Sequence, residues 1–219
     1  MRYVDDARLA VLATARDMAH RGLTEGTAGN VSARQHDGTV VVTPSSVDYD
    51  QMEIDDLVVV DAGGNVLEAK DGRSPTSELS LHLACLRAFD DVGSVVHSHP
   101  VHATMFAVAR RPIPCCIDEF AVYVGGEVRV TPYAKSGTPQ VGEHAVAALE
   151  RRAAALIANH GMVAVGSRPE TALKVTALVE RAAQIVLGAE RLGAAHALPD
   201  DVNQEFARIY TQFVRGTVL

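Results

Sequence analysis

The run SVVHSH at residues 94–99 places two histidines at the end of a short apolar segment that stops at Pro100. An apolar run of this length before a proline favours a buried β-strand over a helix. Side chains two positions apart on a strand point to the same face, so His97 and His99 are expected to converge on one point. The sequence therefore predicts a chain built around a buried strand that carries two imidazoles at one end.

Helical and strand periodicities alternate along the rest of the chain. Helical spacing of apolar residues predicts a short helix after Pro100 and longer ones over residues 5–21, 78–89, 142–152, 169–191 and 200–213. Shorter apolar segments predict strands, the first four forming two hairpins, at 31–34, 39–43, 57–61, 65–68, 94–99, 113–117, 128–131, 155–159 and 162–165. Ser77 is the expected N-cap of the helix over 78–89.

No linker, repeat or low-complexity block divides the sequence. We therefore expect residues 1–219 to form a single three-layer α/β domain, with a mainly antiparallel central sheet flanked by helices. Of the 219 residues, 47% are apolar and 21% are charged, which excludes wholesale disorder.

Charge and hydropathy exclude several classes of partner. A formal net charge of −7 argues against a nucleic-acid or anionic-membrane binder. No apolar run approaches the ~20 residues that span a bilayer. The three cysteines lack the CxxC spacing of a thiolate zinc site. We expect a cytoplasmic protein that has neither nucleic acid nor membrane as a partner.

A third histidine can join the pair at the end of the buried strand. His160 ends another predicted strand and precedes Gly161, so it can lie at the same edge of the sheet. Three imidazoles with one open position are the pattern of a catalytic zinc site. The alternative is a set of unrelated polar residues at strand ends. His82, four residues after Glu78, either faces this site or packs in the core, and packing is the expectation.

Four short motifs follow one another along the chain: GNVS at 29–32, PTSE at 75–78, HSHPVHAT at 97–104 and NHG at 159–161. With these motifs the sequence resembles the class II aldolase/epimerase family over residues 5–190, and within it most of all the L-fuculose-phosphate aldolases. The resemblance implies an α/β fold around a mainly antiparallel sheet, and a homotetramer with active sites at subunit boundaries.

The same resemblance implies a set of site residues. It assigns one Zn²⁺ per subunit to His97, His99 and His160, with Glu78 as the resting fourth ligand and as the catalytic acid/base. It places the substrate phosphate against Gly29, Asn30, Ser45, Ser46, Thr76 and Ser77.

Elementary chemistry supports a phosphate site at the last two of these residues. Thr76 and Ser77 immediately precede a predicted helix, where free N–H groups and the helix dipole favour an anion. Taken singly, each of the six residues also fits an ordinary turn or cap. Ser46 stands where many family members have glycine.

The resemblance implies a metal-dependent class II aldolase. Such an enzyme cleaves a ketose 1-phosphate, here best matched to L-fuculose 1-phosphate or a related deoxyketose phosphate, into dihydroxyacetone phosphate and an aldehyde. Zn²⁺ is the expected cofactor, although a His/Glu site also accepts Mn²⁺ or Co²⁺.

Other activities stay open. Asp118 or Glu119 stands roughly where the 4-epimerases that act on L-ribulose 5-phosphate carry an aspartate, whereas Glu78 favours the aldolase branch. Tyr123 lies near the position where the aldolases place a tyrosine, but is shifted from it. A dehydratase, a decarboxylase or a non-catalytic binding module are further alternatives.

Tyr210 is the remaining candidate catalytic residue. Aldolases that this chain resembles supply a tyrosine from the C-terminal segment of a neighbouring subunit, and Tyr210 stands one residue away from that register. A tyrosine near a metal can transfer a proton on the oxygen side of the reaction. Tyr210 also lies four residues after Phe206, so a packed aromatic on the last helix is the alternative.

Overall fold

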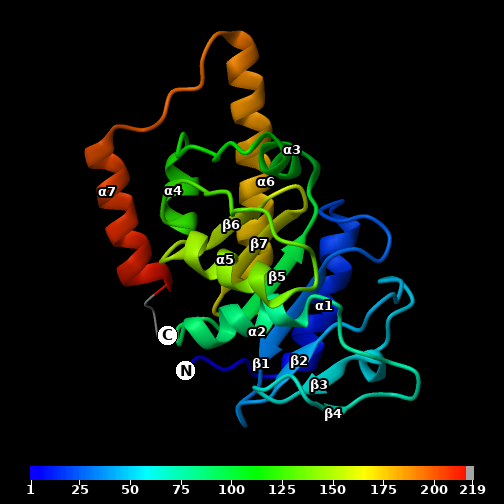
Figure 1. Ribbon diagram of the computed structural model, residues 1–219. Coiled ribbons are helices and arrows are strands. Elements are labelled where there is room, and N and C mark those ends of the chain that lie inside the picture. The colour runs from blue at the N-terminus through cyan, green and yellow to red at the C-terminus, as the bar shows by residue number, and fades with distance from the viewer. Residues whose placement is uncertain (216–219) are drawn as a thin grey trace.

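The computed structural model describes residues 1–215, which contain one seven-stranded sheet in the order β4-β3-β2-β1-β5-β7-β6 (Figure 1). Every pair of neighbouring strands is antiparallel. The strands are β1 (Asn30–Arg34), β2 (Val40–Val42), β3 (Val58–Val60), β4 (Val66–Glu68), β5 (Ser94–Ser98), β6 (Ala154–Ile157) and β7 (Gly161–Gly166).

Helices flank this sheet on both faces. They are α1 (Ala7–His20), α2 (Leu79–Ala88), α3 (Val101–Ala109), α4 (Asp118–Val124), α5 (Pro139–Leu149), α6 (Pro169–Leu192) and α7 (Asp200–Ile209), with a 3₁₀ turn at Ile54–Asp56 and a π-helical segment at Tyr210–Arg215. The predicted three-layer α/β class is therefore confirmed. Within residues 1–215, no helix combines the length and apolarity needed to cross a bilayer.

Helices α2 and α5 cover one face of the sheet. Alternate strand residues such as Val42, Val95 and Val163 pack with these helices in one buried apolar cluster. Because strand side chains alternate, His97, two positions after Val95, points to the same side as α2. His97, a predicted metal ligand, is thus buried between β5 and α2.

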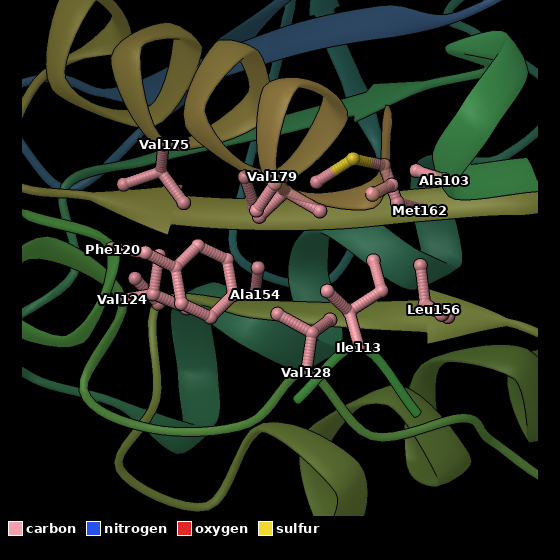
Figure 2. Packing of buried hydrophobic residues seen from close by; sticks show 14 of the residues in the cluster. Ala103, Ile113, Phe120, Val124, Val128, Ala154, Leu156, Met162, Val175 and Val179 are labelled. Carbon is pink, nitrogen blue, oxygen red and sulfur yellow. The ribbon is translucent and has the colours of Figure 1, made fainter. Parts of the chain in front are cut away.

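The opposite face is covered by α1 and α6, with α3 and α4 beside them. Val31 and Val96 pack under α1. At the other end of the sheet, Figure 2 shows Val175 and Val179 of α6 packed together with Phe120 of α4 beside β6 and β7. Buried apolar clusters thus pack against both faces of the sheet, and β5 lies between β1 and β7.

The structure corrects two predicted strands. Residues 113–117 and 128–131 form only isolated bridges, from Ile113 to Val128 and from Val130 to Leu156. Pro112 and Pro114 flank Ile113 and lack the N–H that a ladder requires, so the pairing cannot extend. Between Ile113 and Val128 along the chain lies α4, a helix that the sequence pattern did not predict.

The predicted N-cap of α2 is also wrong. The helix begins at Leu79, so Glu78 and not Ser77 is the N-cap, and no side-chain capping bond is formed there. Instead, the Thr76 hydroxyl accepts the Glu78 N–H at 3.3 Å. The turn Thr76–Ser77–Glu78 therefore leads into the helix. The Glu78 carboxylate does not cap the helix and instead contacts Asn30 and His97 of the sheet.

Candidate metal centre

Four side chains from three parts of the chain meet at one end of the sheet. They are Glu78 before α2, His97 and His99 at the end of β5, and His160 in the turn between β6 and β7, and one ligand atom of each lies within 4.8 Å of the others. The predicted convergence of the histidines is therefore a feature of the fold.

A tight turn brings His160 to the end of β5. Asn159 has a φ of 56°, a left-handed conformation that asparagine tolerates better than most residues. A Cβ at Gly161 would stand 2.6 Å from Cδ2 of His99 and would also overlap the Ser98 carbonyl. Only glycine lets β7 approach β5 this closely, and this approach places the His160 ring 4.8 Å from that of His99.

His97 is held with one defined nitrogen toward the cluster. Its Nδ1 lies 2.8 Å from the Met162 carbonyl, which can only accept a hydrogen bond, so Nδ1 carries the proton. Nε2 therefore faces the cluster, where it lies 2.9 Å from Nε2 of His99. A carbonyl that orients the ring of a ligand histidine is the usual outer support of a protein metal site.

Two of the imidazoles are held in the neutral form that binds metals. Burial, reinforced by the neighbouring His97 and His160, lowers the pKa of His99 to about 4. Burial also lowers the pKa of His160, with His97 acting in the same direction. Neutral imidazole nitrogens beside a carboxylate are a donor set that Zn²⁺, Mn²⁺ and Co²⁺ accept, so the residues fit such an ion.

Glu78 connects the histidines. Its Oε2 lies 2.8 Å from Nε2 of His97, and its Oε1 lies 3.6 Å from Nε2 of His160. The hydroxyl of Ser136 donates to Oε1 at 2.9 Å. Burial by itself raises the pKa of Glu78, but the His97 and His160 imidazoles and the Ser136 hydroxyl outweigh it, so this pKa lies below its ordinary value. The side chain is therefore a carboxylate.

Ser136 was missed by the sequence analysis. It lies on the segment before α5, far from Glu78 along the chain and outside all four motifs, so no local pattern marks it. Only the folded chain brings its hydroxyl to the carboxylate.

Gly29 and Asn30 of the predicted phosphate site border the cluster. Gly29 has a φ of 77°, and a Cβ there would stand 2.9 Å from the His97 carbonyl oxygen. The buried Tyr49 hydroxyl donates to the Gly29 carbonyl at 2.6 Å. Asn30 pairs with His97 in the ladder, and its Nδ2 donates to Oε2 of Glu78 at 3.3 Å.

Two loops carry the other predicted phosphate residues. The Ser45 N–H donates to the Ser74 carbonyl at 2.9 Å, and the Thr76 N–H donates to the Thr43 carbonyl at 3.2 Å. These bonds tie the loop of Ser45 and Ser46 to the loop of Thr76 and Ser77. Ser46 has a φ of 58°, a left-handed conformation that glycine adopts without strain.

Tyr210 lies in the core of its own chain. Its side chain is 4% exposed and packs in the apolar cluster beneath α4 and α6, against Gly125. Burial raises the pKa of Tyr210 to about 12. This placement favours the packing alternative, and the catalytic role of Tyr210 stays a prediction.

The acidic residues that keep an epimerase open lie on α4. Asp118 and Glu119 occupy its first turn and are exposed. Tyr123, one turn later, has the Lys174 ammonium 3.5 Å from the centre of its ring. None of these three belongs to the cluster of Glu78 and the histidines.

Comparisons with known proteins agree with this geometry. Residues 9–187 match the family described as class II aldolase and adducin N-terminal domain. The chain is 34% identical over 203 residues to an L-fuculose phosphate aldolase of Escherichia coli O6:H1, covering 93% of this chain and 92% of that protein. It is 35% identical over 206 residues to a 5-methylthioribulose-1-phosphate/5-deoxyribulose-1-phosphate aldolase of Rhodospirillum rubrum, covering 94% and 90%.

A solved structure gives the same result. The structure of an L-fuculose 1-phosphate aldolase matches with a TM-score of 0.89 and 32% identity over 96% of this chain and 98% of that chain. The resemblance drawn from the four motifs is thereby confirmed, and the chain belongs to the family of class II aldolases and adducin N-terminal domains.

Proposed function

We propose that this protein is a metal-dependent aldolase that cleaves a ketose 1-phosphate into dihydroxyacetone phosphate and an aldehyde. The observation that carries the proposal is the cluster of Glu78, His97, His99 and His160 beside the loops of Gly29–Asn30 and Thr76–Ser77. A donor set for a divalent cation thus adjoins backbone and side-chain donors suited to a phosphate. The relatives named above act on ketose 1-phosphates, which supports this substrate class.

The substrate we propose is L-fuculose 1-phosphate or a related deoxyketose 1-phosphate. The relatives' substrates share a phosphate at carbon 1 and lack a free hydroxyl at the far end of the sugar. The phosphate would lie against Gly29, Asn30, Ser45, Ser46, Thr76 and Ser77. In its contact with Glu78, Asn30 uses one N–H, and a primary amide has a second that can bind the anion.

The Glu78 carboxylate would move the proton at carbon. Cleavage of the C3–C4 bond leaves the electron pair on C3, which must be protonated, while the C4 hydroxyl loses its proton. In the direction of synthesis, Glu78 would take a proton from the hydroxymethyl carbon of dihydroxyacetone phosphate, and in cleavage it would return that proton to C3. A general acid/base of this kind contributes roughly 10²–10⁴-fold in rate.

His97, His99 and His160, with Glu78 in the resting state, would hold one Zn²⁺ per subunit, and Mn²⁺ or Co²⁺ fit the same donors. When bound, the ion supplies Lewis-acid polarisation of the substrate carbonyl. The residues hold and orient the reacting groups around it. The bond from His97 Nδ1 to the Met162 carbonyl fixes the ring for this task.

We also propose a homotetramer with sites at subunit boundaries. Val101, Met105 and Val108 of α3 are 58%, 49% and 54% exposed and share one face of the helix. A helix this apolar on its open side is expected to be covered, and a second copy of the chain suits it because α3 follows directly on the histidines of β5. A single domain over residues 1–219 and a cytoplasmic location, where sugar phosphates are made and used, complete the proposal.

A product assay with metal-replete protein tests the function. Pentulose and hexulose 1-phosphates, together with L-ribulose 5-phosphate, are incubated with the protein, and triose phosphate and sugar epimers are both measured. Release of dihydroxyacetone phosphate from a ketose 1-phosphate is the expected result, and Glu78→Gln is the control for contaminating activity. An epimer of unchanged mass, with no triose phosphate, would instead identify an epimerase.

A further inference from the structure

A series of hydrogen bonds links Ser32 of β1 to His82 of α2, His82 to Asn30 of β1, and Asn30 to Glu78. Asn30 and Ser32 are two positions apart on β1, so both side chains point to the α2 side of the sheet. His82 of α2 is fully buried over them. Its Nε2 lies 2.6 Å from Oδ1 of Asn30, and its Nδ1 lies 2.7 Å from Oγ of Ser32. The ring thus bridges two side chains of one strand.

The chemistry of the groups fixes which atom donates and which accepts in each of these hydrogen bonds. The Glu78 carboxylate can only accept hydrogen bonds, so Asn30 must present its Nδ2, and not its Oδ1, at 3.3 Å. Oδ1 then faces His82, whose Nε2 must carry a proton. A neutral ring with its proton on Nε2 has a lone pair on Nδ1, which accepts the Ser32 hydroxyl. Every member is satisfied in this one arrangement.

The charge state of His82 agrees with it. Burial, with the neighbouring His97 acting in the same direction, lowers the pKa of His82 to about 3. The ring is therefore neutral at any ordinary pH. A protonated ring would carry a hydrogen on Nδ1 as well as on Nε2. The Ser32 hydroxyl would then have to accept instead of donate.

We propose that His82 is a positioning residue that fixes the amide orientation of Asn30 and, through it, the Glu78 carboxylate. This inference rests on the proposed function for its catalytic consequence, since Glu78 is the acid/base there. Without the Nε2–H donor, the Asn30 amide can rotate and turn its oxygen toward the carboxylate, which repels it. His82 is therefore both a buried core residue and a hydrogen-bond donor to a residue of the site.

Two substitutions at this position separate hydrogen bonding from packing. His82→Phe keeps a buried ring but removes both hydrogen bonds, whereas His82→Gln keeps one donor and one acceptor. We expect His82→Phe to weaken Zn²⁺ binding, measured by competition with a chelating dye, by about tenfold or more, the scale known for outer-shell partners of metal ligands. We expect kcat to fall by a similar factor with a smaller change in KM, and His82→Gln to recover most of both losses.

Cys85→Ala is the matched control. Cys85 is a fully buried side chain of the same helix, so its truncation perturbs the packing of α2 without touching the hydrogen-bonded chain. We expect Zn²⁺ affinity and kcat within about twofold of the wild type even if Tm falls. Unchanged Zn²⁺ affinity and kcat in His82→Phe, or equal losses in His82→Phe and His82→Gln, would overturn the proposal.

A measurement on the wild-type protein covers the case in which the His82 variants do not fold. Long-range ¹H–¹⁵N correlation of the histidine rings reports which nitrogen carries the proton. The proposal requires His82 with Nε2–H and an unprotonated Nδ1 down to pH 5, and its signal is identified by its shift in Ser32→Ala. The opposite tautomer would overturn it. If the wild type cleaves no ketose 1-phosphate, the proposed function fails, while Zn²⁺ affinity and the tautomer still decide this inference.

Discussion

Oε2 of Glu78 lies 2.8 Å from Nε2 of His97, the nitrogen that His97 turns away from the Met162 carbonyl. Ligand atoms of His99 and His160 lie within 4.8 Å of both groups, so one ion could contact all four side chains. A residue that serves as both a resting metal ligand and an acid/base needs this position.

The first prediction concerns the metal. The purified protein should hold about one divalent ion per subunit, because the cluster provides one set of four ligand atoms. Treatment with a chelator should remove aldolase activity, and Zn²⁺ should restore it, as followed by metal analysis and by release of triose phosphate. Full activity in metal-free protein, or in His97→Ala, would contradict the prediction.

Glu78→Gln should separate turnover from phosphate binding. The amide cannot transfer the proton at carbon, so kcat should fall roughly 10²–10⁴-fold. Asn30, the proposed phosphate residue that donates to the carboxylate, has a second N–H for the anion, so inhibition by inorganic phosphate should change much less than kcat. Near-normal turnover would reduce Glu78 to a charge at the start of α2.

Ser136→Ala should have a smaller effect of the same kind. The hydroxyl donates to Oε1 of Glu78 at 2.9 Å, and a hydrogen bond to a charged group is worth about 1.5–3 kcal/mol. Because Ser136 lies on an exposed segment where water can replace the donor, we expect kcat to fall only several-fold. Lys135→Ala, on the exposed neighbouring residue, is the matched control, and equal losses in both variants would show that the segment and not the hydroxyl matters.

The stability of the metal-free protein should fall as the pH falls below about 6.5. The pKa of His82 is about 3 in the folded chain, below its ordinary value of 6.5, so between these values the unfolded state binds more protons. One such group lowers the free energy of unfolding by up to about 1.4 kcal/mol per pH unit. Denaturant titrations between pH 7 and 5 should show a shallower dependence in His82→Gln, and an identical dependence would refute the assignment.

The predicted role of Tyr210 requires the residue to leave the core of its own chain, where it is 4% exposed, and to reach a neighbouring subunit. Mixed tetramers of Tyr210→Phe and Glu78→Gln subunits test this. Turnover above that of either parent is expected if the site is shared between chains. Normal turnover in the Tyr210→Phe protein alone would leave Tyr210 as a packed aromatic residue.

Much of the fold follows from local patterns. The strand with His97, both hairpins and the long helices appear where apolar periodicity predicts them, because these elements bury one face each and the pattern records that face. The two failed strands at 113–117 and 128–131 have strand-like composition, but prolines stop the ladder beside Ile113. The pattern could not reveal α4 between them, because its seven residues are too short for a clear helical period.

The sequence by itself determined the residue types of the candidate site and the two-residue spacing that aims His97 and His99 to one side. Only the tertiary structure decided which distant groups complete it. Ser136 reaches Glu78, and His82 joins Asn30 to Ser32, through contacts between segments that are far apart in the chain. Such contacts depend on how α2 and the segment before α5 pack on the sheet, and this packing is set by the whole core and leaves no periodic trace in the sequence.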